Sequence, residues 1–200
     1  MRTHPAQSGF TRGRLLRAAL ASGAAVAGGA AIAGLPRGAS AQSESVTDTD
    51  ILNVLLLLEH VQEDFYRAAA EGGRFDGELR RFAEVVGRQE TEHVAFLRER
   101  LGGAADERPR TDFGDALSSP ERFRETAIDL EEATIGVYVG QGANLSRDTV
   151  GPIAGLVAVE ARQAAWVRDL AGVSPAPRAA DPAGEADAVL ADLRQRGFIQ

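Results

Sequence analysis

Cysteine is absent from this chain, so neither disulfide bonds nor thiolate metal sites are available to it. Any metal site must therefore use Glu, Asp and His, a ligand set that suits iron or manganese. Lysine is absent as well, which makes all 22 basic residues arginine, and we interpret this as a bias of genome composition. No segment shows the alternating pattern that is typical of a strand. These absences favour an all-α protein with only oxygen and imidazole ligands for a metal.

Positive charge is scarce outside the N-terminal segment 1–41. The formal net charge is -7, but residues 1–41 hold five arginines and no acidic residue. The other 17 arginines stand against 29 acidic residues, which gives -12 for the remainder. Such an acidic surface binds nucleic acid poorly, so we expect no nucleic-acid partner. Its acidity fits solubility.

The N-terminal segment 1–41 has the layout of an export signal peptide. Residues 1–17 are basic, residues 18–35 are apolar but dominated by Ala and Gly, and Ala39-Ser40-Ala41 forms a small-x-small site. We expect cleavage after Ala41 and a mature protein in the periplasm or outside the cell. The alternative is a retained membrane anchor, because the apolar stretch is near the minimum spanning length of about 18 residues.

A basic motif in this leader indicates the export route. Thr11-Arg12-Gly13-Arg14 resembles the twin-arginine motif, although Gly13 separates the two arginines. An ordinary secretory signal is the alternative. In either case the leader is the part that contacts the export machinery, and membrane contact is expected only through an uncleaved leader.

Five helices are predicted after a polar lead-in at residues 42–49. They cover residues 50–71, 77–101, 120–142, 147–171 and 182–196. Thr47 or Asp48 caps the first helix, glycine pairs end the first and second, and Ser119-Pro120 starts the third. Short turns within each pair and a longer crossing between the pairs predict an antiparallel four-helix bundle over 50–172. Residues 173–200 form a C-terminal loop and a short helix, expected to cover one end of the bundle.

The second predicted helix carries an acid and an imidazole on an apolar face. Glu90 and His93 are three residues apart, and Phe82, Val86 and Leu97 share their helix face. Burying an ionised carboxylate without a partner costs several kcal/mol or more. A metal ion is one candidate partner for Glu90.

The two halves of the bundle repeat this pattern. Glu59 and Tyr66 in the first helix match Glu131 and Tyr138 in the third, with the same spacing from Glu to Tyr. Glu90 and His93 match Glu160 and Gln163 in the fourth helix, again with equal spacing. Two helix hairpins related by a pseudo-two-fold axis would bring the four glutamates to one level of the bundle.

The repeated glutamates predict a metal site. One Glu from each of two helices, plus Glu-x-x-His from the other two, is the ligand set of ferritin-like di-iron and di-manganese bundles. The candidate ligands are Glu59, Glu90, His93, Glu131, Glu160 and Gln163. Gln163 stands where a His is expected, and its neutral amide is a weaker ligand, so one ion, two ions and no ion are all open. Without metal, the buried polar groups would hydrogen-bond one another.

Several neighbours of these ligands have a structural interpretation. Tyr66 and Tyr138 are expected to be core tyrosines that hydrogen-bond a glutamate. Either Gln62 or Glu63 extends the inward stripe of the first helix, and Glu63 is expected to be solvated or beside the ligands. His60 points about 100° away from Glu59, which favours a surface or interhelical role over ligation.

The chain resembles exported bacterial ferritin-like domain proteins, which are related to plant desiccation-related proteins. The resemblance covers about residues 50–172. It rests on Leu58-Glu59, Gln89-Glu90-Thr91-Glu92-His93, Leu130-Glu131 with Tyr138, the loop Phe113-Gly114-Asp115-Ala116-Leu117, and Ala158-Val159-Glu160-Ala161-Arg162. It implies a first metal site made by Glu59, Glu90 and His93, and a second served by Glu131 and Glu160, with Glu90 and Glu160 as bridges.

The resemblance leaves two main functions open. The first is a metal-binding, oxidoreductase-like protein that uses iron or manganese with oxygen or peroxide. The second is a non-enzymatic, structural or stress-protective bundle whose metal site is partial or lost. An iron-storage cage is a third, which nothing in the sequence indicates, and we make no prediction of the oligomeric state.

Overall fold

The computed structural model describes residues 46–200, so the predicted leader lies outside the described residues. The helices are α2 (Asp48–Glu71), α3 (Gly77–Leu101), α4 (Pro120–Gly142), α5 (Arg147–Leu170) and α6 (Ala186–Gln195), with a short 3-10 turn, η1 (Gly102–Ala104). Between residues 46 and 200 there is no strand, and a single isolated bridge joins Thr111 to Ile199. The predicted all-α fold is confirmed.

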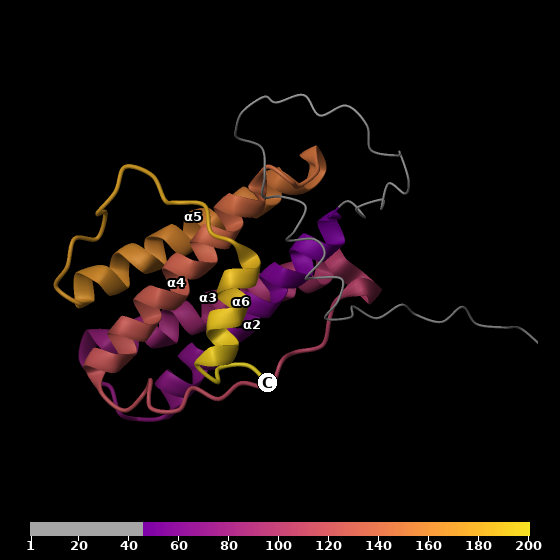
Figure 1. The fold of residues 1–200 in the computed structure, drawn as a ribbon. Helices are drawn as coiled ribbons and strands as arrows, with labels where there is room; N and C mark the ends of the chain where they lie inside the picture. Colours follow the sequence, from indigo (N-terminus) through magenta and orange to yellow (C-terminus); the bar gives the residue numbers. More distant parts are fainter. Residues whose placement is uncertain (1–45) are drawn as a thin grey trace, which may run out of the picture. The chain divides into compact units, whose positions relative to one another are not determined.

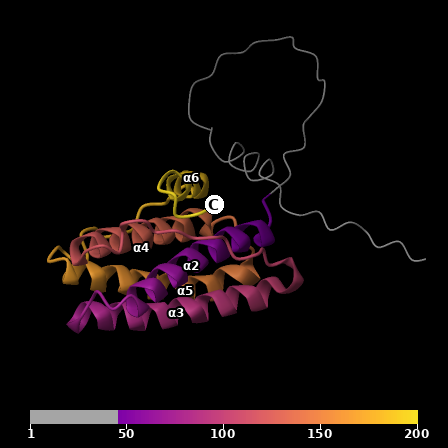
Figure 2. The same cartoon turned by 90° about the horizontal axis from the view of Figure 1, so that it is seen from below.

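The four long helices run side by side as two hairpins (Figure 2). α2 packs chiefly against α3, and α4 packs chiefly against α5. The hairpins meet through α2 with α4 and through α3 with α5. The segment between η1 and α4 crosses back along the bundle (Figure 1). No helix in the described part of the chain is long and apolar enough to cross a membrane.

Side-chain caps set the starts of two helices. The Thr47 hydroxyl accepts a hydrogen bond from the Asp50 backbone N–H, and the Asp50 carboxylate accepts one from the Thr47 N–H at 2.9 Å. This capping box starts α2 two residues before the predicted position. Ser119 caps α4 through the N–H of Arg122, and Pro120 occupies the first helical position.

Aromatic side chains from all four long helices pack into one cluster of the core. The rings of Phe65 (α2) and Phe123 (α4) stack with centroids 5.3 Å apart. The rings of Phe82 (α3) and Trp166 (α5) meet edge to face at 5.1 Å. Each contact joins the two hairpins, so the cluster fixes how one hairpin sits on the other.

The last helix differs from its prediction in start and in place. It begins at Ala186, not after Asp181, because the Gly184 N–H donates to the Gly136 carbonyl of α4 at 2.7 Å. This contact holds the backbone just before α6 against α4, in a conformation that is not helical. α6 then crosses the outer side of α4 (Figure 2) and does not cover an end of the bundle.

Candidate metal centre

Each long helix contributes one glutamate to the centre of the bundle. Glu59 (α2), Glu90 (α3), Glu131 (α4) and Glu160 (α5) have no exposed surface. They are buried because each lies on the inward stripe of its helix. The repeat in the sequence therefore corresponds to four carboxyl groups, one from each helix, in the core.

Three of these glutamates and one histidine bring their ligand atoms together. One atom each of Glu59, Glu90, His93 and Glu160 lies within 4.8 Å of the others. His93 Nδ1 is 3.2 Å from Glu59 Oε2, 3.2 Å from Glu90 Oε2 and 2.9 Å from Glu160 Oε1. Neighbouring ligands of a hard cation with metal–ligand distances of about 2.1 Å and octahedral geometry are about 3 Å apart. The spacing around His93 fits the coordination sphere of one such ion.

Hydrogen bonds within the protein do not satisfy all of the carboxylate oxygens that converge on His93. A single imidazole proton cannot serve three carboxylate oxygens at once. The short contact from His93 to Glu160 lacks hydrogen-bond alignment, so Glu160 Oε1 is buried without a hydrogen-bond donor. A buried acceptor in this state is costly, and a cation would satisfy it.

The other two predicted ligands lie next to this group but outside it. Glu131 Oε1 accepts a hydrogen bond from Tyr66, and Glu131 Oε2 has no partner. The Gln163 amide donates to Glu90 Oε1 at 2.7 Å and to Gln89 Oε1 at 3.1 Å. The structure thus brings four of the five acidic and histidine candidates together at their ligand atoms, while Gln163 presents its NH₂ group to Glu90.

The two tyrosines hold glutamates across the bundle in a symmetrical pair of contacts. Tyr66 of α2 donates to Glu131 of α4, and Tyr138 of α4 donates to Glu59 of α2. Both tyrosines are buried. The two contacts are equivalent under the repeat seen in the sequence. Each fixes one oxygen of a glutamate on the opposite hairpin.

Gln62 and Thr134 extend the polar network, although the sequence alone assigns neither of them a place at the metal site. The Gln62 amide donates to Glu160 Oε2 at 3.3 Å, and the Thr134 hydroxyl donates to Gln62 Oε1 at 2.9 Å. The stripe of the first helix left Gln62 and Glu63 as alternatives, and Gln62 is the inward residue. The repeat that matches Glu59 with Glu131 also matches Gln62 with Thr134, and this was the signal that could have found both.

Glu63 is buried rather than solvated, which corrects one of its two predicted alternatives. Glu63 and Asp64 are buried, and Arg108 from the crossing segment binds both carboxylates. Thr91 also donates to Glu63, at 3.1 Å. His60 is buried too, 3.6 Å from Glu63 of the same helix, so it does not have the surface role that was one of its predicted alternatives. The sequence could not show this because Arg108 is brought to α2 only by the fold.

Burial and mutual repulsion change the acidity of the cluster. Burial, followed by repulsion from Glu160, raises the pKa of Glu90 and Glu131 well above the usual range. Burial, followed by repulsion from Glu59, raises the pKa of Glu160 to about 7. Burial also opposes ionisation of Glu59, but hydrogen bonds, led by that of His93, leave its pKa lowered.

The pKa of the histidine in the same cluster shifts in the direction opposite to the effect of its burial. Burial disfavours the charged imidazole, but the nearby carboxylates of Glu160, Glu59 and Glu90 outweigh it and raise the pKa of His93. Without metal, protons therefore balance part of the negative charge of the cluster. A divalent cation would take the place of these protons.

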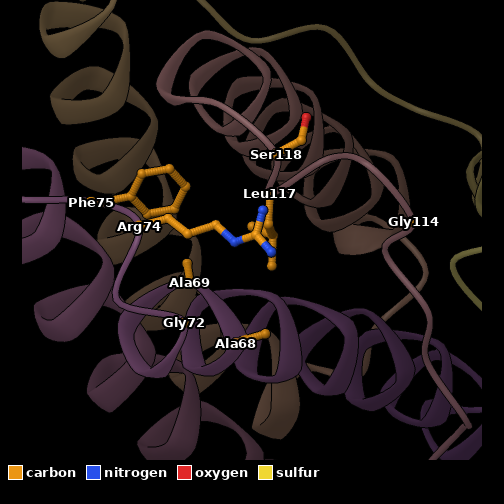
Figure 3. Close-up of a pocket in the computed structure, with 8 residues that line it drawn as sticks. All are labelled: Ala68, Ala69, Gly72, Arg74, Phe75, Gly114, Leu117 and Ser118. Carbon is orange, nitrogen blue, oxygen red and sulfur yellow. The ribbon is translucent and has the colours of Figure 1, made fainter.

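A surface hollow lies apart from this cluster. Its volume is about 270 Å³, and it lies between the end of α2 and the crossing segment. Arg74, Phe75 and Ser118 are among its lining residues (Figure 3). None of its lining residues belongs to the carboxylate cluster, whose four members are all buried in the core.

The comparison with known families agrees with this geometry. Residues 47–173 match the ferritin-like domain family, a span that includes all four long helices. A search of curated proteins finds no match. The match covers more than half of the chain and includes every residue of the cluster. The chain therefore belongs to the ferritin-like domain family.

Proposed function

We propose that the protein binds iron or manganese through Glu59, Glu90, His93 and Glu160. The convergence of three carboxylates on His93 Nδ1, with Glu160 Oε1 left without a hydrogen bond, is the observation that carries this proposal. Carboxylate oxygens with one imidazole suit these ions, and cysteine is absent. A cation would also offset the cost of burying several acidic groups together.

The proposed activity is a reaction with oxygen or peroxide. An iron or manganese ion held there would supply the redox chemistry. Tyr138, Gln62 and Gln163 each hold one oxygen of a ligand glutamate, so the donor set is fixed before an ion binds. His93 is the one member of the four with exposed surface, 7%, which favours a small oxidant over a large substrate.

A non-enzymatic, stress-protective bundle is the second candidate function. It is favoured by the Gln163 amide, which already occupies Glu90 Oε1 at 2.7 Å. A site filled in this way by protein donors has less need of a metal. Metal content shows whether the protein binds a metal ion, which the first candidate function requires. Consumption of oxygen or peroxide then shows whether the metal-loaded protein is active.

The proposed location is the periplasm or the outside of the cell. The layout of residues 1–41 and the resemblance to exported bacterial proteins related to plant desiccation-related proteins support it. Expression of the full chain with N-terminal sequencing tests it. A product in the exported fraction that begins at Gln42 is expected, and an uncut cytoplasmic chain would contradict export.

The experiment that tests metal binding uses the full chain after metal removal. It is reconstituted anaerobically with ferrous iron or manganese, and bound metal per chain is measured by mass spectrometry. Glu90→Ala should lose the metal, whereas Glu92→Ala, on an exposed position of the same helix, should keep it. A wild-type chain that retains no metal would sink the proposal. Oxygen and peroxide consumption is then measured on the loaded protein.

A further inference from the structure

The two oxygens of each candidate bridging glutamate have different partners. Glu90 Oε2 lies 3.2 Å from His93 Nδ1, whereas Glu90 Oε1 accepts the Gln163 amide at 2.7 Å. Glu160 Oε1 lies 2.9 Å from His93 Nδ1, whereas Glu160 Oε2 accepts the Gln62 amide at 3.3 Å. One oxygen of each therefore faces His93, where an ion would bind, and the other accepts a hydrogen bond from an amide.

Few ligand atoms are left for an ion beside Gln163. Glu131 Oε1 accepts from Tyr66, and the buried atoms without a partner on that side are Glu131 Oε2 and Gln163 Oε1. One of them is a neutral amide oxygen. Among the described residues, the group of converging ligand atoms does not include one from Glu131.

The orientation of the Gln62 amide is set by a third residue. The Thr134 hydroxyl donates to Gln62 Oε1, which turns the Gln62 NH₂ group towards Glu160. An ion bridging Glu90 and Glu160 would have to displace two amide donors, Gln62 and Gln163. These neutral donors bind the carboxylate oxygens that such an ion would need.

We infer that the centre holds a single divalent ion beside His93, and that Gln62 and Gln163 replace the second ion as hydrogen-bond donors. This inference rests on the proposed function, because it specifies how many ions the same cluster binds. Four carboxylates would balance two divalent ions, so one ion leaves negative charge to be offset. Hydrogen bonds from Gln62, Gln163, Tyr66 and Tyr138 stabilise the carboxylates that carry this remaining charge.

Metal stoichiometry of three full-length chains tests the inference. Wild type, Gln163→His and Glu131→Gln are stripped of metal, reconstituted anaerobically with manganese(II), and freed of loosely bound ions. We expect one ion per chain in wild type and in Glu131→Gln, and two in Gln163→His. Electron paramagnetic resonance provides a second measurement, because an isolated manganese(II) ion gives a six-line spectrum and a coupled pair does not.

Each other outcome identifies which proposal fails. Two ions with a coupled spectrum in wild type would overturn the single-ion inference and leave the proposed function standing. No ion in wild type would overturn the proposed function itself. A Glu131→Gln chain without metal, or a folded Gln163→His chain that still binds one ion, would contradict the roles proposed for Glu131 and Gln163. Circular dichroism of each chain verifies folding.

Discussion

Tyr66 and Tyr138 differ in what their hydrogen bonds hold. Tyr138 donates to Glu59, whose other oxygen faces His93, whereas Tyr66 donates to Glu131, which lies outside the four converging ligands. Both phenols are buried and each has one such partner, so the two contacts are matched in chemistry. They should therefore have similar effects on stability and different effects on metal binding.

Tyr138→Phe should weaken metal binding about 10-fold or more, because a ligand carboxylate loses the group that orients it. Tyr66→Phe is the matched control and should change the affinity much less. Each substitution should lower the free energy of unfolding by about 1–3 kcal/mol, since a buried acceptor loses its donor. Titration with manganese(II) measures the affinity. Equal losses of affinity in both variants would contradict the assignment of Glu59 and Glu131.

At the scale of residues, the helical period indicated the inward position of each glutamate. The four carboxyl groups could be placed because the spacing from Glu59 to Tyr66 recurs from Glu131 to Tyr138, and the surroundings of Glu90 recur at Glu160. The choice between Gln62 and Glu63 could not be made, because both lie near the edge of one stripe. The sequence also could not show that the Gln163 amide faces Glu90, since amide orientation depends on partners from other helices.

The crossing segment between η1 and α4 is held to α2 by one ionic cluster. Arg108 binds Glu63 and Asp64, and Thr111 donates to Asp64 at 2.9 Å. The acidic side chains are 10% and 8% exposed and the Arg108 side chain is 37% exposed. Losing the ion pairs would therefore cost the buried acids more free energy than it would cost the partly exposed Arg108.

Arg108→Ala should lower the free energy of unfolding by about 2 kcal/mol, because it leaves two buried carboxylates with fewer partners while solvent screens part of the loss. Arg122→Ala, whose partner Asp115 is 70% exposed, should change it by less than about 0.5 kcal/mol. Denaturant unfolding measures both. An Arg108→Ala chain as stable as wild type would refute this role. Metal content should be unchanged in both variants.

The contact of α4 with the segment before α6 depends on glycine. A Cβ atom at Gly140 would overlap the Gly184 carbonyl oxygen, whereas a Cβ atom at Gly155 of α5 would meet nothing within 4 Å. Gly140→Ala should therefore destabilise by about 1–3 kcal/mol, and Gly155→Ala should stabilise by up to about 1 kcal/mol. Thermal unfolding measures both. Stabilisation by Gly140→Ala would show that α6 docks in another way.

At the scale of elements, helix bounds were predictable where local signals set them. Thr47, Ser119 and the terminal glycines act within a few residues, and the four long helices begin and end within two residues of the prediction. The start of α6 was wrong because its cause is distant in sequence. Asp181-Pro182 has the pattern of a helix start, but the bond from Gly184 to Gly136 outweighs it.

The stability of the whole molecule should depend on pH and on metal together. Glu160, with its pKa raised to about 7 by burial and repulsion, favours folding in its protonated form. That contribution is fully present below about pH 4.5 and is lost as pH rises through about 7. Glu90 and Glu131 act in the same direction, because their pKa values are raised as well.

The metal-free chain should therefore melt at a lower temperature at pH 8 than at pH 5.5, by about 5 °C or more. Manganese(II) should remove the difference, because the ion favours the ionised carboxylates. Calorimetry at the two pH values, with and without metal, measures this. Glu160→Gln should show a smaller dependence on pH. A metal-free chain that is more stable at pH 8 would refute the protonated state of the cluster.

The position of one ion among Glu59, Glu90, His93 and Glu160 decides whether the proposed function is correct. Anomalous X-ray diffraction at the manganese absorption edge, from crystals of the manganese-loaded chain, locates that ion. We expect one strong anomalous peak among these four side chains, with none between Glu131 and Gln163. A loaded crystal with its peak elsewhere, or with no peak in the bundle core, would refute the site.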